Sequence, residues 1–341
     1  MERTSQLFIN TSRLQIAYYR AGETHADKLL LLHGNLSSSV FFLPLLPVLS
    51  QQFDVVAPDL RCFGDTEDRP VDAVRGYRDW SDDVNALLDA LGWEKASVGG
   101  WSMGGNVAMQ FAIDHADRVN KLILIAPGPP FGFGGTRDPE GIGYDPPGLG
   151  SGGGCVNPLL LSTVKTQGEF LLHPILHHFY FTSSHYLDPG WEALFVEGVQ
   201  KTRLGRDQYP GDFRCSFRWP FVAAGDHGIL NAMSPLYGNL SGLVEVKDKP
   251  PILWIRGRDD VVVSDHSMFD FGYLGMIGTI PGWPGSWVYP PQPMLAQTRY
   301  LLERYREKEG SFQEVVIPGG HACHLESPGY FVPLLCSFLL G

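Results

Sequence analysis

The chain has 341 residues, of which 44% are hydrophobic and 18% charged, and its net charge is −11. This size suffices for one large α/β domain with an insertion, or for two modest domains. The acidic balance argues against nucleic acid and anionic membrane surfaces as partners, because both bind basic faces.

Strand and helix patterns alternate through the first part of the chain. Near period-two patterning on both sides of Asn10 predicts an antiparallel hairpin, and continuous apolar runs predict strands that are covered on both faces. Repeated β-α units of this kind predict a doubly wound, mostly parallel sheet. The expected elements are the hairpin (6–22), strands at 28–34, 53–60, 95–101 and 121–128, and helices at 39–52, 77–92 and 102–119, the first of them disturbed by Pro44 and Pro47.

The alternation stops after residue 130. Residues 131–155 are crowded with Gly and Pro, and the helical patterns that follow have no convincing strand between them, which predicts an inserted, mainly helical cap. We therefore expect a core of residues 1–130 and 245–341 and a cap of residues 131–244. The expected later elements are cap helices near 157–180, 190–204 and 227–238, strands at 250–257 and 311–320, a long connection at 264–292, and helices at 293–310 and 327–341.

The segment GGWSMGGN (99–106) places Ser102 between a predicted strand and a predicted helix. A serine on such a tight turn projects above the sheet, with strained backbone dihedrals, as the G-x-S-x-G nucleophile motif requires. Gly100 and Gly104 would leave room where a Cβ would collide with neighbouring backbone. The alternative is that Ser102 only caps the N-terminus of the helix.

A serine nucleophile needs a base, and the base needs an orienting carboxylate. On this kind of sheet their order along the chain is serine, acid, histidine. Asp260 directly follows a strong strand, and Asp259 is the alternative acid. His321 follows the last strand, with His324 as the alternative base. Glu326 is interpreted as a structural carboxylate.

An oxyanion hole requires two backbone N–H donors beside the nucleophile. The Met103 amide, at the start of the helix, is one predicted donor. The loop at His33–Asn35 supplies the other, with Asn35 N–H preferred and Leu36 N–H as the alternative. His33 itself is interpreted as a structural ring that satisfies backbone groups of the loop.

Five motifs together resemble the α/β-hydrolase superfamily over about residues 1–130 and 245–341. They are HGN (33–35), PDLRCFGDTE (58–67), GWSMGG (100–105), GRDD (257–260) and GGHACHLESP (319–328). The resemblance implies the α/β-hydrolase fold with a variable cap, the triad Ser102, Asp260 and His321, and no cofactor. In PDLRCFGDTE, Cys62 stands where the family often has glycine, and we interpret it as a buried thiol.

The expected activity is hydrolysis of a small apolar carboxylic ester or lactone through an acyl-enzyme. HGN resembles the loop of dehalogenases and epoxide hydrolases, but those families carry an aspartate nucleophile where Ser102 stands. C–C bond hydrolases share the S-M-G-G elbow. The alternatives are therefore C–C bond hydrolysis, amide hydrolysis, acyl transfer, perhydrolysis, or a slow-turnover ligand receptor of the same fold.

The predicted cap (131–244) and the long connection (264–292), together called the inserts, raise three further expectations. Their aromatic residues should form the core of the cap, and a subset should wall an apolar pocket over Ser102. The Gly-rich run 132–154 is either a mobile lid or a loop held by its neighbours. His173, His177 and His178 lie close together, and i, i+4 spacing suits a metal, but no acidic or Cys partner lies nearby in the sequence, so we expect no metal.

Five scattered cysteines without C-x-x-C spacing predict free, mostly buried thiols in a reducing compartment. The N-terminal residues lack an apolar run behind positive charge, which predicts no signal peptide. The longest apolar runs have strand length, so we expect no membrane-spanning segment and a cytoplasmic location.

Overall fold

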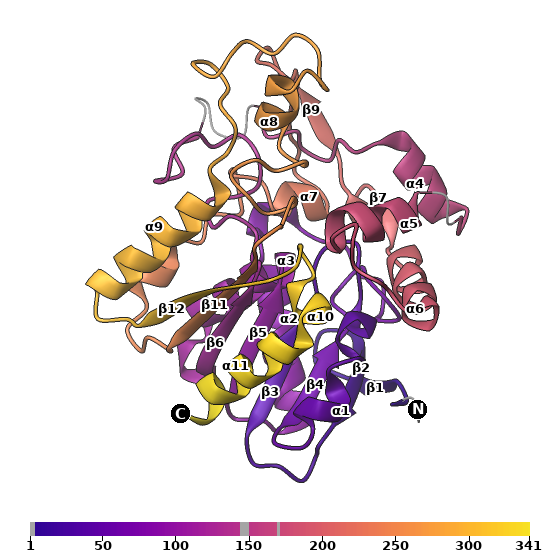
Figure 1. Ribbon diagram of the computed structural model, residues 1–341, viewed down its shortest axis with the longest axis vertical. Coiled ribbons are helices and arrows are strands. Elements are labelled where there is room, and N and C mark those ends of the chain that lie inside the picture. Colours follow the sequence, from indigo (N-terminus) through magenta and orange to yellow (C-terminus); the bar gives the residue numbers. More distant parts are fainter. Residues whose placement is uncertain (1–3, 144–149, 169–170) are drawn as a thin grey trace.

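A computed structural model describes residues 4–143, 150–168 and 171–341 (Figure 1). Eight strands form one sheet in the order β1-β2-β4-β3-β5-β6-β11-β12. β1, β2 and β4 pair antiparallel, and every pairing from β4 to β12 is parallel. The strands are β1 (Leu7–Asn10), β2 (Gln15–Ala21), β3 (Lys28–Leu32), β4 (Asp54–Pro58), β5 (Ala96–Trp101), β6 (Val119–Ile125), β11 (Ile252–Gly257) and β12 (Phe312–Ile317).

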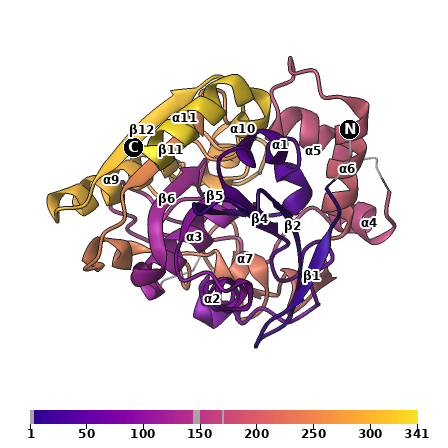
Figure 2. The same cartoon turned by 90° about the horizontal axis from the view of Figure 1, so that it is seen from below.

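Helices cover both faces of this sheet, as a doubly wound fold requires. Figure 2 shows α2 (Arg78–Leu91) and α3 (Met103–Asp114) on one face, and α1 (Leu46–Leu49) and α11 (Pro328–Leu340) on the other. α9 (Met294–Glu307) connects β11 to β12. The central strands are almost fully buried because helices cover both of their faces, which explains their continuous apolar sequences.

Most predicted core elements are present, including the hairpin and the alternating units. The segment 39–52 forms only the 3₁₀ turn η1 (Ser39–Phe42) and the short α1. Pro44 and Pro47 explain this interruption, since a proline donates no backbone hydrogen bond and restricts the residue before it.

The segment between β6 and β11 is mainly helical, as expected, but it also contains strands where none was expected. It contains α4 (Pro158–Lys165), α5 (Leu172–Ile175), the π-helical turn η4 (Leu176–Tyr180), α6 (Pro189–Gln200), α7 (Ile229–Ala232) and the 3₁₀ helix η5 (Ser241–Glu245). Two small sheets also form here, from strands too short to produce a sequence periodicity. These strands are β7 (Leu204–Gly205) with β8 (Tyr209–Pro210), and β9 (Phe213–Cys215) with β10 (Val222–Ala224). The division into core and cap stays a prediction.

Neighbouring segments hold the described flanks of the Gly-rich run. Gly134 N–H donates to Gln292 Oε1 at 2.7 Å, and Gln292 Nε2 donates to the carbonyl of Gly132 at 2.9 Å. Gln292 lies in the long 264–292 connection, which also carries α8 (Phe271–Met276). Residues 144–149 of the run, including Tyr144, lie outside the described residues.

The aromatic side chains of the inserts and the five cysteines of the chain differ in burial. Phe131, Tyr180, Phe181 and Trp219 are buried, as a cap core requires, whereas Trp287 is 98% exposed. Cys62 and Cys323 are buried, Cys336 is half-buried, and Cys155 and Cys215 are exposed, so the prediction of mostly buried thiols is wrong. No helix within the described ranges is long and apolar enough to cross a bilayer.

Two imidazoles are completely buried beneath the end of the sheet. Burial lowers the pKa of His33 to about 4, although its hydrogen bond to Gly34 opposes this. Burial and then the nearby His321 lower the pKa of His324 to about 3. Neither ring nitrogen of His324 has a hydrogen-bond partner in the described structure, and its ring packs on Trp101 at 5.1 Å and on Phe42 at 5.5 Å.

His324 should make the fold sensitive to acid. The unfolded chain takes up a proton at this residue below a pKa of about 6.5, whereas the folded chain does so only near 3, so the free energy of unfolding falls as pH drops below about 6.5. Between about pH 7 and pH 5, the free energy of unfolding should fall by roughly 2 kcal/mol less in His324→Leu than in the parent protein. Denaturant unfolding at both pH values measures this, and an unchanged loss in the variant would refute it.

Candidate active site

Ser102 lies on a sharp turn between β5 and α3. Its backbone has φ 56° and ψ −123°, a region that non-glycine residues rarely adopt, so the predicted strain is present. Its N–H donates to Ile125 O at 2.9 Å, and its carbonyl accepts from Gly105 N–H at 2.9 Å. Its side chain makes no capping hydrogen bond to α3 and is partly exposed. The helix-cap alternative therefore has no support in the geometry.

Three glycines permit the close backbone approach around this turn. A Cβ on Gly100 would lie 2.1 Å from Gly104 O, and a Cβ on Gly104 would lie 2.2 Å from Leu32 O. A Cβ on Gly34 would lie 2.9 Å from the Cβ of Ser102. Only glycine fits at these positions, so the loop after β3 runs directly beside Ser102.

His321 and Asp260 form a buried pair. His321 Nδ1–H donates to Asp260 Oδ2 at 2.9 Å, and the two side chains are 2% and 3% exposed. Asp260 Oδ1 accepts from Val262 N–H at 2.7 Å and Val263 N–H at 3.0 Å, which fixes the carboxylate. Asp259 is exposed, and it makes a backbone bond to Gly319. Of the two acids, Asp260 is therefore the one that orients His321.

The loop of His321 is attached to the residue that precedes Ser102. Trp101 Nε1–H donates to the carbonyl of His321 at 2.9 Å, and the two rings are 5.4 Å apart. Because Trp101 and Ser102 are consecutive, this bond holds the histidine loop at the same end of the sheet as the serine. His324, the alternative base, is enclosed among aromatic rings in the short helix α10 (Cys323–Glu326).

His33 holds the loop that carries Asn35. Its Nδ1–H donates to Gly34 O at 2.8 Å, and its Nε2 accepts from Leu60 N–H at 2.9 Å. Ser37 Oγ also donates to Gly34 O, at 2.7 Å. His33 thus satisfies backbone groups of its own loop and of the segment after β4, as expected for a structural ring.

Sequence reasoning missed a contact from the insert to this loop. Tyr180, at the end of η4, donates its phenol hydroxyl to Asn35 O at 2.8 Å, and Leu36 O lies 3.1 Å from the same oxygen. The backbone carbonyl of Tyr180 accepts from Ala322 N–H at 2.7 Å. Tyr180 therefore joins the loop of Asn35 to the loop of His321.

Glu326 strengthens the same connection. Its Oε1 accepts from Gly320 N–H at 2.6 Å, and its Oε2 accepts from Thr182 Oγ1 at 2.7 Å and from Thr182 N–H at 3.1 Å. Glu326, predicted as a structural carboxylate, therefore links the loop of His321 to Thr182 in the segment between β6 and β11. No motif or spacing identifies these partners, because residues 180 and 182 are far from residues 320 and 326 in the sequence.

The histidine cluster of the insert has an acidic partner after all. Glu192 of α6 lies against His173 of α5 and His177 of η4. The assumption that no acidic side chain is near these histidines is therefore wrong, since it considered only neighbours in the sequence. His178 is exposed and is not among the potential metal ligands found in the described residues.

Comparison with known proteins identifies the fold. A family model described as the alpha/beta hydrolase fold matches residues 28–152. The enol-lactonase from Burkholderia xenovorans LB400 superposes with a TM-score of 0.62 at 18% identity, over 98% of this chain and 100% of that one. At that identity the superposition establishes the fold alone.

Curated relatives match part of the chain. A soluble epoxide hydrolase of Corynebacterium sp. (strain C12) is 38% identical over 120 residues, which are 35% of this chain and 40% of that protein. The carboxylesterase YbfK of Bacillus subtilis (strain 168) is 32% identical over 121 residues, which are 33% of this chain and 40% of that protein. This chain thus spans well under half the length of these relatives. The family match over residues 28–152 and the superposition together show that this chain has the α/β-hydrolase fold.

Proposed function

We propose that this chain is a serine hydrolase that cleaves small apolar carboxylic esters, lactones included, through an acyl-enzyme. The observation that carries the proposal is the buried His321–Asp260 pair, together with the bond that holds it near Ser102. The carbonyl of His321 accepts a hydrogen bond from Trp101, the residue before Ser102. Ser102 itself has a strained backbone, and its side chain makes no capping bond to α3. Similarity over a third of the chain to a protein named as a carboxylesterase supports the same chemistry.

In the proposed acylation step, Ser102 Oγ attacks the substrate carbonyl carbon and His321 Nε2 takes the hydroxyl proton. Asp260 stabilises the resulting imidazolium through the Nδ1–H bond. The amides of Asn35 and Met103 donate to the developing oxyanion, and the dipole of α3 favours that charge. His321 then protonates the leaving alcohol oxygen as the C–O bond breaks, which leaves the acyl group on Ser102.

In the proposed deacylation step, His321 takes a proton from water as the water oxygen attacks the acyl carbon. Collapse of the second tetrahedral intermediate returns a proton to Ser102 and frees the carboxylic acid. With a lactone, the alcohol and the acid remain in one molecule. Both steps use the same base and the same oxyanion donors.

The nucleophile distinguishes this proposal from epoxide hydrolysis. The families whose HGN loop this chain resembles use an aspartate carboxylate for their alkyl-enzyme, and a serine stands at that place here. Assays with ester, lactone, amide and epoxide substrates, and with alcohol or peroxide as acceptors, separate the remaining chemistries. Binding without turnover across this panel would instead indicate a receptor.

Replacing the nucleophile should abolish turnover. Ser102→Ala should lower kcat for a short-chain ester by at least about 10³-fold, because the covalent route is lost. The melting temperature should not fall, since the hydroxyl makes no capping bond. Ser241→Ala, at an exposed serine that begins η5, is the control and should keep full activity. Turnover retained in Ser102→Ala would refute the assignment.

The two adjacent carboxylates provide a matched test of the triad acid. Asp260→Asn should lower kcat by up to about 10⁴-fold, because an amide no longer holds the productive imidazole tautomer. Asp259→Asn should change kcat by less than about twofold, since Asp259 is exposed. Steady-state kinetics of both variants measure this. Equal losses, or a larger loss at Asp259, would contradict the assignment.

Tyr180 is proposed as a positioning residue for the oxyanion loop. Tyr180→Phe removes the hydroxyl that bonds Asn35 O, so the Asn35 amide should lose its orientation. We expect kcat to fall about 10- to 100-fold with little change in KM, because the oxyanion contact forms mainly in the transition state.

The control for Tyr180 is Tyr77→Phe, which removes the hydroxyl of another fully buried tyrosine. Tyr77→Phe should keep the kcat of the parent protein even if its melting temperature falls as much as that of Tyr180→Phe. A kcat for Tyr180→Phe equal to that of the parent protein, or a loss no larger than in the Tyr77 variant, would remove the positioning role.

A further inference from the structure

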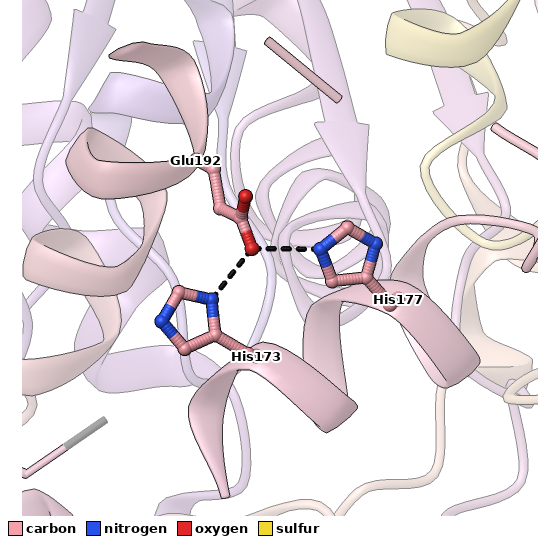
Figure 3. Close-up of side chains that lie close together, drawn as sticks. All are labelled: His173, His177 and Glu192. Atoms are coloured by element: carbon pink, nitrogen blue, oxygen red, sulfur yellow. Dashed lines mark hydrogen bonds and ion pairs between the residues drawn. The ribbon is translucent and has the colours of Figure 1, made fainter. Parts of the chain in front are cut away.

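Two imidazoles and one carboxylate converge on the surface of the insert (Figure 3). His173 and His177 lie one helical turn apart on the α5–η4 segment, and Glu192 reaches toward both from α6. One oxygen of Glu192, Oε1, lies 2.5 Å from His173 Nδ1 and 2.7 Å from His177 Nε2. The proposed ester chemistry uses none of these three side chains.

We propose that His173, His177 and Glu192 form a binding site for a divalent transition metal of the zinc class. Two imidazole nitrogens and one carboxylate oxygen are a common ligand set for such an ion, with a fourth position filled by water. The three candidate ligand atoms all lie within 4.8 Å of one another. Among the described residues, no other group of three ligands meets this criterion.

The geometry needs only small adjustments to admit an ion. Ligand atoms about 2.1 Å from a tetrahedral zinc are about 3.4 Å apart, so each Glu192–histidine pair must open by roughly 1 Å. The side chains of His173 and His177 are 44% and 34% exposed, and that of Glu192 is 17% exposed. Both imidazoles are therefore accessible to an ion from solvent.

An ion bound here would join two helical segments that now touch through side chains. His177 belongs to the same helical turn η4 that ends at Tyr180. Tyr180 in turn bonds the loop of Asn35 and the backbone of Ala322. The bound metal would therefore brace the insert segment that contacts both predicted catalytic loops, and we expect it to raise the stability of the whole chain.

The test uses metal-free full-length protein without a histidine tag, with Zn²⁺ and Co²⁺ as probes. We expect one equivalent of Co²⁺ to bind and to give visible absorption bands typical of Co²⁺ that is coordinated by histidine. Zn²⁺ should displace the Co²⁺, and saturating Zn²⁺ should raise the melting temperature by about 3 °C or more.

Variants assign the binding to these three residues. His173→Ala, His177→Ala and Glu192→Gln should each weaken Co²⁺ binding at least about tenfold. His178→Ala removes an exposed histidine beside His177 and should bind as the parent does. Circular dichroism identifies variants that fail to fold. Glu192→Gln removes the carboxylate ligand but nearly preserves the size of the side chain, so this variant still tests the site if an alanine variant does not fold. No stoichiometric binding, or binding that survives in His173→Ala and His177→Ala, would overturn the proposal.

Discussion

The close approach of backbones at one end of the sheet is the constraint on which the candidate site depends. Gly100 and Gly104 leave no room for a Cβ, so α3 begins almost in contact with the end of β3, and Gly34 brings the next loop against Ser102. This approach forces Ser102 into its strained conformation, places the first amides of α3 beside its side chain and brings the Asn35 loop alongside. The strain is offset by a large core, in which the central strands are almost completely buried.

The segment between β6 and β11 is bonded to both loops of the candidate site. Tyr180 bonds the loop of Asn35 through its hydroxyl and the loop of His321 through its backbone, and Glu326 ties the histidine loop to Thr182. A movement of η4 would therefore disturb the proposed oxyanion donors and the proposed base together. This arrangement makes the insert a route by which events on its surface, such as metal binding, reach the proposed chemistry.

The parts of the structure that follow from local pattern were predictable. Apolar runs gave the buried strands, and parallel topology placed Ser102, Asp260 and His321 after three different strands at the same end of the sheet. The short strands of the insert were missed because two or three residues carry no periodicity. Tyr180 and Glu192 were missed because their partners are brought close only by tertiary packing. The buried His324 also shows that a histidine beside a predicted base, in the same motif, can be enclosed by aromatic rings with no polar partner.

The central claim is that the side chain at position 102 is the nucleophile. Labelling with a fluorophosphonate, followed by proteolysis and mass spectrometry, tests it most directly, because the probe phosphonylates only a serine activated by a neighbouring base. The account predicts one adduct per chain, located on Ser102 and absent when His321 is replaced by alanine. An adduct on another residue, or no adduct on a folded protein, would contradict it.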